Sequence, residues 1–249
     1  MDSQPPDTQG PVLVTGAARG LGAAIAIALA ETGVEPLLLG RSLESLSQTR
    51  AEAERILGRQ VHAIGANVAI WEETEKAISD ALAGEGRLSG IVNNAGVIDA
   101  IDRLEDTDPF AWAQCIAVNL VGAYHVLRAG LPRLGSGAVI VNMSSGAAAA
   151  EHAGWSAYAA SKAGLERLSA TLAGERPDLT VLAVRPGITD TDMQAAIKSS
   201  RIDNAIRQLP RDAMQPVKVP AQAIARLFSD IRPPFAERVI EARLLNQRE

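Results

Sequence analysis

The sequence predicts a single doubly wound α/β domain built on one parallel sheet. Its 249 residues match the size of a large α/β unit. Seven short apolar runs lack polar alternation, which is typical of strands buried on both faces. Amphipathic stretches alternate with these runs, a pattern that indicates βαβ units with right-handed crossovers. No repeat or linker divides the chain.

The elements follow one another along the chain with little between them. The predicted strands are Val12–Thr15, Pro36–Gly40, Val61–Gly65, Gly90–Asn93, Ala138–Met143, Thr180–Arg185 and Arg238–Ala242. The predicted helices are Leu21–Thr32, Leu43–Leu57, Glu72–Leu82, Pro109–Leu131, Gly154–Leu172 and Pro220–Ile231. Residues 1–10 are polar and proline-containing, so we expect a flexible leader. The polar stretch 187–219 is too long for an ordinary connection and predicts a substrate lid.

Composition excludes several classes of function. A net charge of −5 argues against a nucleic-acid binder, and no apolar run approaches the length of a membrane span. The single cysteine excludes an internal disulfide framework and fits a reducing compartment. Three scattered histidines show no ligand spacing, so no metal site is expected. Without a signal peptide, the chain is predicted to be cytoplasmic.

A glycine-rich turn follows the first predicted strand and opens the first helix. It runs from Thr15 to Gly22, with glycines at 16, 20 and 22. Such glycines allow a tight turn and close backbone approach to a pyrophosphate, and the helix N-terminus attracts the anion. An ordinary glycine-rich turn is the alternative, but the strand–turn–helix context favours dinucleotide binding. The predicted contacts are Gly16, Arg19, Gly20, Leu21 and Gly22.

The residues after the second strand predict which dinucleotide is bound. A site that prefers NAD usually places a carboxylate there for the ribose 2′-hydroxyl. This chain instead has Arg41 and Ser42. A guanidinium can bind a 2′-phosphate through several donors, and Arg19 could approach the same phosphate. We therefore expect NADPH rather than NADH, the alternative being a solvated arginine at a helix start.

Tyr158 and Lys162 lie four residues apart in a predicted helix, which places them on one face. Tyrosine is a poor acid at neutral pH, and a cation one turn away is expected to lower its pKa. Ser145 follows a strand at the sheet edge where α/β proteins bind ligands, and its hydroxyl could donate to a substrate carbonyl. Alone, the pair could be a surface feature; with the glycine turn, it predicts acid–base chemistry.

Together these motifs resemble the short-chain dehydrogenase/reductase family over the chain from Pro11 onwards. They are Thr15–Gly22, Asn93–Gly96, Ser145, Tyr158 with Lys162, and Arg185–Gly187. The resemblance implies a seven-stranded Rossmann sheet and hydride transfer between a nicotinamide and a carbonyl or alcohol. It also implies small-molecule substrates and a homodimer or homotetramer formed through the helices 109–131 and 154–172.

The resemblance assigns roles residue by residue. Tyr158 would be the proton donor, Lys162 would lower its pKa and hold the nicotinamide ribose, and Ser145 would orient the carbonyl. Asn119 would help to organise a water near the lysine. The remaining cofactor contacts would be Asn94, Ala95, Pro186, Ile188, Thr191, Asn67 and Val68. Asn67 replaces an aspartate frequent in the family near adenine.

Shorter motifs, such as Ser144–Ala147 and Pro186–Gln194, resemble the sepiapterin reductase and benzil reductase group. We therefore expect an NADPH-dependent reductase of ketones or vicinal dicarbonyls. The alternatives are a 3-oxoacyl-thioester reductase and an NADPH-sensing protein without turnover. Some neighbouring residues are not assigned to the site. Cys115 is interpreted as buried, His152 as a loop residue, Asp190 and Asp192 as solvated, and Trp155 as either a pocket wall or an interface residue.

Overall fold

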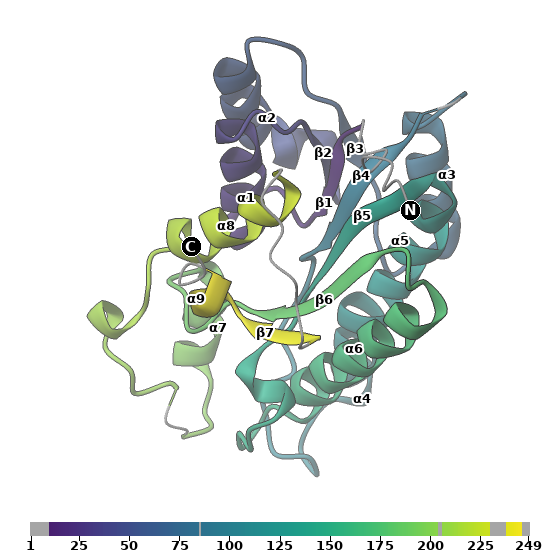
Figure 1. Ribbon diagram of the computed structural model, residues 1–249. Coiled ribbons are helices and arrows are strands. Elements are labelled where there is room, and N and C mark those ends of the chain that lie inside the picture. The colour runs from purple at the N-terminus through teal and green to yellow at the C-terminus, as the bar shows by residue number, and fades with distance from the viewer. Residues whose placement is uncertain (1–9, 85, 204–205, 230–237, 246–249) are drawn as a thin grey trace.

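A computed structural model describes residues 10–84, 86–203, 206–229 and 238–245, and its strands form one parallel sheet (Figure 1). The strand order is β3-β2-β1-β4-β5-β6-β7. The chain therefore builds outwards from β1 in one direction, returns, and continues from β4 in the other. The strands are β1 (Val12–Thr15), β2 (Pro36–Gly40), β3 (Ala63–Gly65), β4 (Leu88–Asn93), β5 (Leu134–Met143), β6 (Thr180–Arg185) and β7 (Val239–Glu241). The prediction of a single doubly wound Rossmann domain is confirmed.

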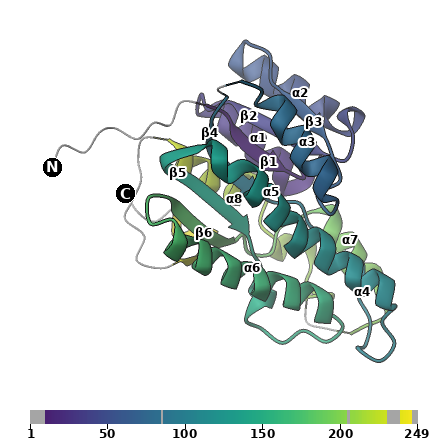
Figure 2. The ribbon, with the colours of Figure 1, turned by 90° about the vertical axis from the view of Figure 1, so that its right-hand side faces the viewer.

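Helices cover both faces of the sheet (Figures 1 and 2). The α-helices are α1 (Gly20–Glu31), α2 (Leu43–Leu57), α3 (Trp71–Ala81), α4 (Pro109–Ile116), α5 (Gly122–Gly130), α6 (Ser156–Glu175), α7 (Asp192–Ser199), α8 (Lys218–Ala225) and α9 (Ala242–Leu245). One apolar core joins the sheet to α1, α2, α8 and α9. A second core joins the opposite face to α3, α5 and α6.

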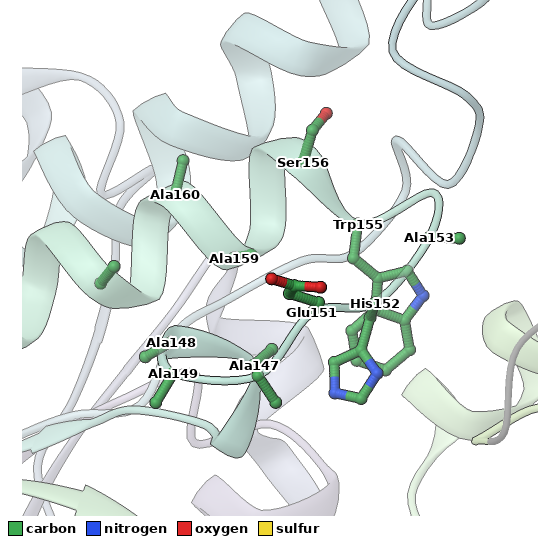
Figure 3. Close-up of a pocket in the computed structure, with 12 residues that line it drawn as sticks. Ala147, Ala148, Ala149, Glu151, His152, Ala153, Trp155, Ser156, Ala159 and Ala160 are labelled. Carbon is green, nitrogen blue, oxygen red and sulfur yellow. The ribbon is translucent and has the colours of Figure 1, made fainter.

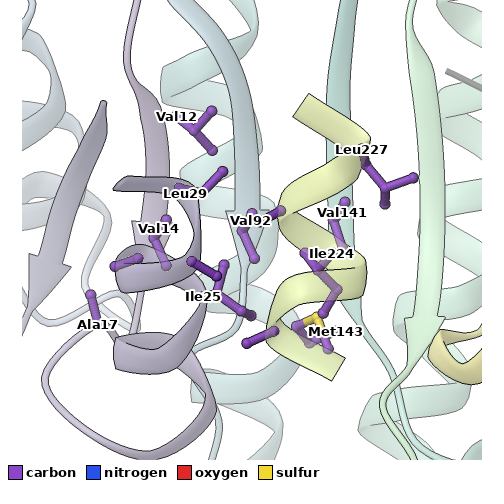
Figure 4. Packing of buried hydrophobic residues seen from close by; sticks show 14 of the residues in the cluster. Val12, Val14, Ala17, Ile25, Leu29, Val92, Val141, Met143, Ile224 and Leu227 are labelled. Carbon is purple, nitrogen blue, oxygen red and sulfur yellow. The ribbon is translucent and has the colours of Figure 1, made fainter. Parts of the chain in front are cut away.

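Successive residues of a strand point into opposite cores, which explains the absence of polar alternation. Val12 and Val14 contribute to the core with Ile25 of α1 and Ile224 of α8, as Figure 4 shows. Leu13 lies between the two valines and contributes to the other core. All of these side chains are fully buried. The buried sheet thus fixes the positions of the loops that follow its strands.

The observed elements differ from the predicted ones in several places. β3 begins at Ala63 rather than Val61, and β4 and β5 are longer at their N-terminal ends, where their pairing shifts register. The helix predicted over 109–131 is interrupted by a π-helix, Ala117–Val121. Helix α6 begins at Ser156, two residues later than expected. The helix predicted over 220–231 begins at Lys218, ends as an α-helix at Ala225 and is followed by a 3-10 helix, Arg226–Phe228. Residues 1–9 of the predicted leader and residues 230–231 lie outside the described residues.

The segment 187–219, predicted as a lid, contains helix α7. Its two ends pair through a parallel bridge between Thr189 and Gln215. The Gln215 backbone N–H donates to Ile188 and its carbonyl accepts from Asp190, while the Gln215 side chain donates to the Pro186 carbonyl. The two ends of the segment therefore lie side by side.

The continuous helical stretch 109–133 has a mean hydropathy of 1.4 in its most apolar window. By length and composition it is apolar enough to cross a membrane, whereas the sequence pattern predicts no such span. About 39% of that window is buried inside the fold, and core helices pass the same test. Here the stretch contributes α5 to the second core.

Candidate active site

The predicted site residues gather at the C-terminal ends of β1, β4, β5 and β6. At β1, Gly16 and Gly20 adopt positive φ angles of 64° and 57°, which side chains other than glycine rarely take. A Cβ on Gly22 would lie 2.2 Å from the Gly16 carbonyl oxygen. Helix α1 therefore starts directly against the turn, and backbone surrounds the space where the predicted pyrophosphate would lie.

The loop after β4 is bonded to this turn. The Thr15 hydroxyl oxygen accepts from the backbone N–H groups of Asn94 and Ala95, both at 3.0 Å. The Asn94 side chain in turn donates to the Thr15 carbonyl at 3.0 Å. The structure thus brings Asn94 and Ala95 next to Gly16, as expected for adjacent strands that end at one sheet edge.

Thr191 brings the segment 187–219 to the same place. Its Cγ2 atom lies 3.7 Å from the position that a Cβ on Gly20 would occupy. Thr191 is also the residue from which helix α7 begins. Pro186 and Ile188 lie just before it, after β6. The starts of α1 and α7 therefore face each other across the glycine turn.

Arg41, Ser42, Asn67 and Val68 lie beyond β2 and β3. Arg41 is exposed and makes no hydrogen bond or ion pair with the described part of the chain. Ser42 caps α2 by accepting from the Ser45 N–H at 3.3 Å. The Asn67 side-chain oxygen accepts from the Ala69 N–H at 3.1 Å, so it already holds its own turn. Val68 is buried.

Tyr158 and Lys162 are both buried, with 7% and 4% of their surfaces exposed. The Lys162 ammonium donates to the Met143 carbonyl at 2.7 Å and lies 5.6 Å from the centre of the Tyr158 ring. The Ser145 hydroxyl oxygen accepts from the Ala147 N–H at 3.2 Å, which leaves its own hydrogen free to donate. The three predicted catalytic residues thus meet at one point.

Burial dominates the electrostatics of this group. It raises the pKa of Tyr158 to about 12, against a smaller lowering effect of Ser145. It lowers the pKa of Lys162 to about 8. The net pKa shift of Tyr158 is thus opposite to the expected direction, and Lys162 is not among its causes. The Lys162 ammonium is bonded to the Met143 carbonyl, and burial is the largest cause of both pKa shifts.

Asn119 occupies the π-helix and is almost completely buried. Its side-chain oxygen accepts from the Val97 N–H at 2.8 Å, and its amide donates to the Val97 carbonyl at 2.9 Å and to Ser161 at 3.0 Å. The Cys115 sulfur lies 3.4 Å from the same amide. Burial raises the pKa of this thiol to about 11. Asn119 therefore links the loop after β4 to helix α6.

Sequence reasoning missed a polar network behind Ser145. The Ser144 hydroxyl donates to Glu166 at 2.7 Å, and Arg185 binds both oxygens of that carboxylate at 2.8 and 2.9 Å. This network joins the end of β5 to α6 and β6. Glu166 lies one helical turn after Lys162, a spacing that could have indicated it.

A family model described as short chain dehydrogenase matches residues 11–202. The chain belongs to the short-chain dehydrogenase/reductase family. It is 39% identical to the short-chain dehydrogenase/reductase FrzI from a Cladobotryum species, over 74% of this chain and 72% of that protein. It is 32% identical to the 3-oxoacyl-[acyl-carrier-protein] reductase FabG of Staphylococcus epidermidis, over 88% and 91% of the two chains.

A solved short-chain dehydrogenase/reductase has the same fold. YIR035C from Saccharomyces cerevisiae superimposes with a TM-score of 0.83 at 26% identity, covering 96% of this chain and 98% of the other. Members of the family are oxidoreductases that use NAD(P)H. The glycine turn fits such a dinucleotide, because a side chain at Gly22 is excluded and no side chain caps the start of α1 at Arg19.

An apolar cluster contains Tyr158 and joins the loop after β4 to α6 and α7. Its buried members include Ile98, Cys115, Trp155, Tyr158 and Ile197. A surface cavity of about 820 Å³ lies beside it, lined by residues 147–153 and the outer face of α6 (Figure 3). Ser145, Tyr158 and Lys162 are not among the residues that line this cavity.

Some of the residues that the sequence does not assign to the site lie close to this cluster. His152 and Trp155 line the cavity and contact each other, with ring centres 4.8 Å apart. Trp155 also meets Tyr158 edge-on, with ring centres 5.8 Å apart. Asp190 is partly buried at the start of the segment 187–219. The side chain of Asp192 lies outside the described part of the structure. Among the described residues, no group of three or more potential ligands could hold a metal ion.

Proposed function

We propose that this oxidoreductase is a cytoplasmic NADPH-dependent carbonyl reductase that reduces a ketone or vicinal dicarbonyl to an alcohol. The observation that carries the proposal is the Tyr158 hydroxyl. It adjoins the Ser145 hydroxyl and the Lys162 ammonium, which lies 5.6 Å from the centre of the Tyr158 ring. A protonated acid beside a hydroxyl donor and a cation suits the reduction of a carbonyl.

The residues divide the chemistry between them. Bound NADPH would supply the hydride. Ser145 donates its hydrogen to the substrate carbonyl and orients it, while Tyr158 gives its proton to the same oxygen as negative charge develops. The positive charge of Lys162 favours the tyrosinate that remains. The apolar cluster around Ile98 and Ile197 excludes water from the reacting groups.

The cofactor would lie along the edge of the sheet. Gly16, Gly20, Leu21 and Gly22 would hold the pyrophosphate with Asn94 and Ala95; Asn67, Val68 and Ser42 would lie near the adenosine; and Pro186, Ile188 and Thr191 would contact the nicotinamide end with Tyr158 and Lys162. Arg41 and Arg19 would bind the 2′-phosphate. The exposed Arg41, without a partner in the described structure, supports the choice of NADPH.

The cofactor preference can be tested at Arg41. Wild type is expected to show a higher kcat/KM with NADPH than with NADH, and Arg41→Asp should reverse or abolish the preference, because a carboxylate repels the 2′-phosphate and accepts from a 2′-hydroxyl. Steady-state kinetics with both cofactors measures the ratio. Equal use of both by wild type, or an unchanged ratio in the variant, would contradict this assignment.

The activity is tested by following NADPH absorbance with ketones, diketones, pteridines and acyl thioesters. Tyr158→Phe should lower kcat by about 10²–10⁴-fold while NADPH binding is kept, because only the proton donor is removed. Tyr124→Phe is the matched control, since Tyr124 is the other tyrosine and is exposed on α5. Tight NADPH binding by wild type without oxidation by any carbonyl would favour a sensor instead.

A second candidate, reduction of 3-oxoacyl thioesters, is favoured by the 32% identity to FabG. The NADPH absorbance measurement distinguishes a thioester reductase from a reductase of ketones or diketones. A kcat/KM for acetoacetyl-coenzyme A above that for diketones would support the thioester reductase.

A further inference from the structure

Trp155 carries a buried donor that the fold does not use. Its side chain is 5% exposed, and its indole Nε1 has no hydrogen-bond partner among the described residues. A buried N–H without an acceptor has lost its bond to water with no compensation. Such a group next to a reaction site is a candidate for ligand binding.

The indole lies beside the proposed proton donor. Trp155 meets the Tyr158 ring edge-on, with ring centres 5.8 Å apart and planes at 89°. His152 packs against the indole, and Figure 3 shows the indole nitrogen on the edge away from the imidazole. The same apolar cluster includes Met193 and Ile197 of α7. The indole therefore lies in a cluster that contains both Tyr158 and residues of the segment 187–219.

A second tryptophan in this cluster shows what the fold can provide. The Trp112 Nε1 donates to the Ser156 hydroxyl at 3.2 Å, so the protein itself satisfies that indole. Both rings pack in one cluster, yet only Trp155 lacks an acceptor in the described structure. The described residues thus satisfy one indole of this cluster and leave the other without an acceptor.

We propose that the Trp155 N–H binds a second oxygen of the substrate, close to the carbonyl that Tyr158 protonates. The inference rests on the proposed function and narrows it. The site then selects ketones that carry a second acceptor oxygen beside the reacting carbonyl, as in vicinal diketones. A ketone without that oxygen leaves the buried N–H unpaired in the complex, which lowers its binding.

The test compares 3,4-hexanedione with 3-hexanone, which share one carbon skeleton and differ in the second oxygen. The ratio of their kcat/KM values is measured for wild type and for Trp155→Phe. The diketone is intrinsically more reactive, but this difference cancels when the ratios of the two proteins are compared. We expect Trp155→Phe to lower the ratio about tenfold or more, through a higher KM for the diketone.

Trp112→Phe is the matched control. It also replaces an indole of this cluster by a phenyl ring, but its N–H is bonded within the protein, so the ratio should not change. An equal ratio in wild type and Trp155→Phe, or an equal fall in both variants, would overturn the inference and leave the reductase proposal standing. No NADPH oxidation by wild type with either ketone, or with any other carbonyl, would overturn both.

A second measurement does not depend on the folding of Trp155→Phe. The chain has three tryptophans, and Trp71→Phe and Trp112→Phe assign the indole N–H resonances by elimination. With NADP bound, 3,4-hexanedione should move the Trp155 indole proton downfield, and 3-hexanone should not. The same shift with both ketones would contradict a bond to the second oxygen.

Discussion

Lys162 is expected to lower the stability of the folded protein while it supports the reductase activity. Burial lowers its pKa from 10.5 to about 8, so charging it costs the folded state about 3 kcal/mol near pH 7. Its bond to the Met143 carbonyl returns about 1 kcal/mol. We therefore expect Lys162→Met to be more stable than wild type to urea near pH 7, while its reductase activity is largely lost.

The pH dependence has a definite sign. Unfolding adds a proton to Lys162 between pH 8 and 10.5, so its cost is full below pH 8 and fades as the pH rises. Wild type should gain about 2 kcal/mol relative to Lys162→Met between about pH 7 and about pH 9.5. Lys218→Met, which removes an exposed ammonium on α8, is the control and should show no such change. A constant difference between wild type and Lys162→Met would contradict the lowered pKa.

At the scale of single residues, sequence identified the triad but not its energetics. The spacing of Tyr158 and Lys162 places both on one helix face, which the structure confirms. Spacing carries no information on desolvation, and burial of both groups reverses the expected direction of the tyrosine pKa. The sequence also does not show whether a buried donor has an acceptor. It therefore leaves Trp155 as either a pocket wall or an interface residue. Glu166, in contrast, had a readable spacing.

At the scale of elements, replacing two glycines in helices by alanine is expected to have opposite effects on stability. Gly22 in α1 has no space for a Cβ, whereas a Cβ on the exposed Gly174 in α6 would meet nothing within 4 Å. Gly22→Ala should cost more than about 2 kcal/mol and abolish NADPH binding, because backbone would have to move. Gly174→Ala should add about 0.5–1 kcal/mol. Urea denaturation and cofactor titration measure both, and similar effects of the two would contradict the packing described here.

The π-helix sets the position of Asn119. Asn119→Leu removes the acceptor of the Val97 N–H and the amide donor of the Val97 carbonyl, so we expect a loss of about 2–3 kcal/mol in unfolding free energy. Urea denaturation measures this loss, and a loss below about 1 kcal/mol would contradict this account of the bonds.

Some elements could not be predicted for physical reasons. Hydrophobic periodicity averages over several turns, so one inserted residue in the stretch 109–131 leaves the helical pattern intact and the π-helix unseen. Helix α7 forms in a polar segment and packs on the apolar cluster through Met193 and Ile197. Its stability therefore comes from tertiary contacts, which override local pattern. The strands β1, β2, β4, β5 and β6, by contrast, are apolar runs that are almost completely buried, which made them easy to recognise.

At the scale of the whole molecule, an apolar surface along α4 and α5 predicts self-association. Phe110 is 85% exposed, and Val121 and Tyr124, three residues apart, are also exposed. Gly164 of α6 packs beside Leu120, so the two helical stretches form one continuous surface. We expect a homodimer or homotetramer, because burying this surface removes apolar area from water.

Replacing Val121 and Tyr124 by arginine should yield a monomer, as measured by sedimentation velocity, since two charges would enter the interface. Leu43→Arg is the control, because Leu43 is exposed on α2 and lies away from this surface. An unchanged mass for the double variant, or a monomeric wild type, would contradict the interface.

The pairing of Thr189 with Gln215 has a consequence for how such proteins diversify. Because the segment between them starts and ends at one point, its length can vary with little cost in loop-closure entropy. The loop after β5 and helix α6, which hold Ser145, Tyr158 and Lys162, are unaffected by such a change. New substrate specificities can therefore arise by exchanging this segment as a cassette, in evolution or by grafting, while the reaction chemistry is inherited intact.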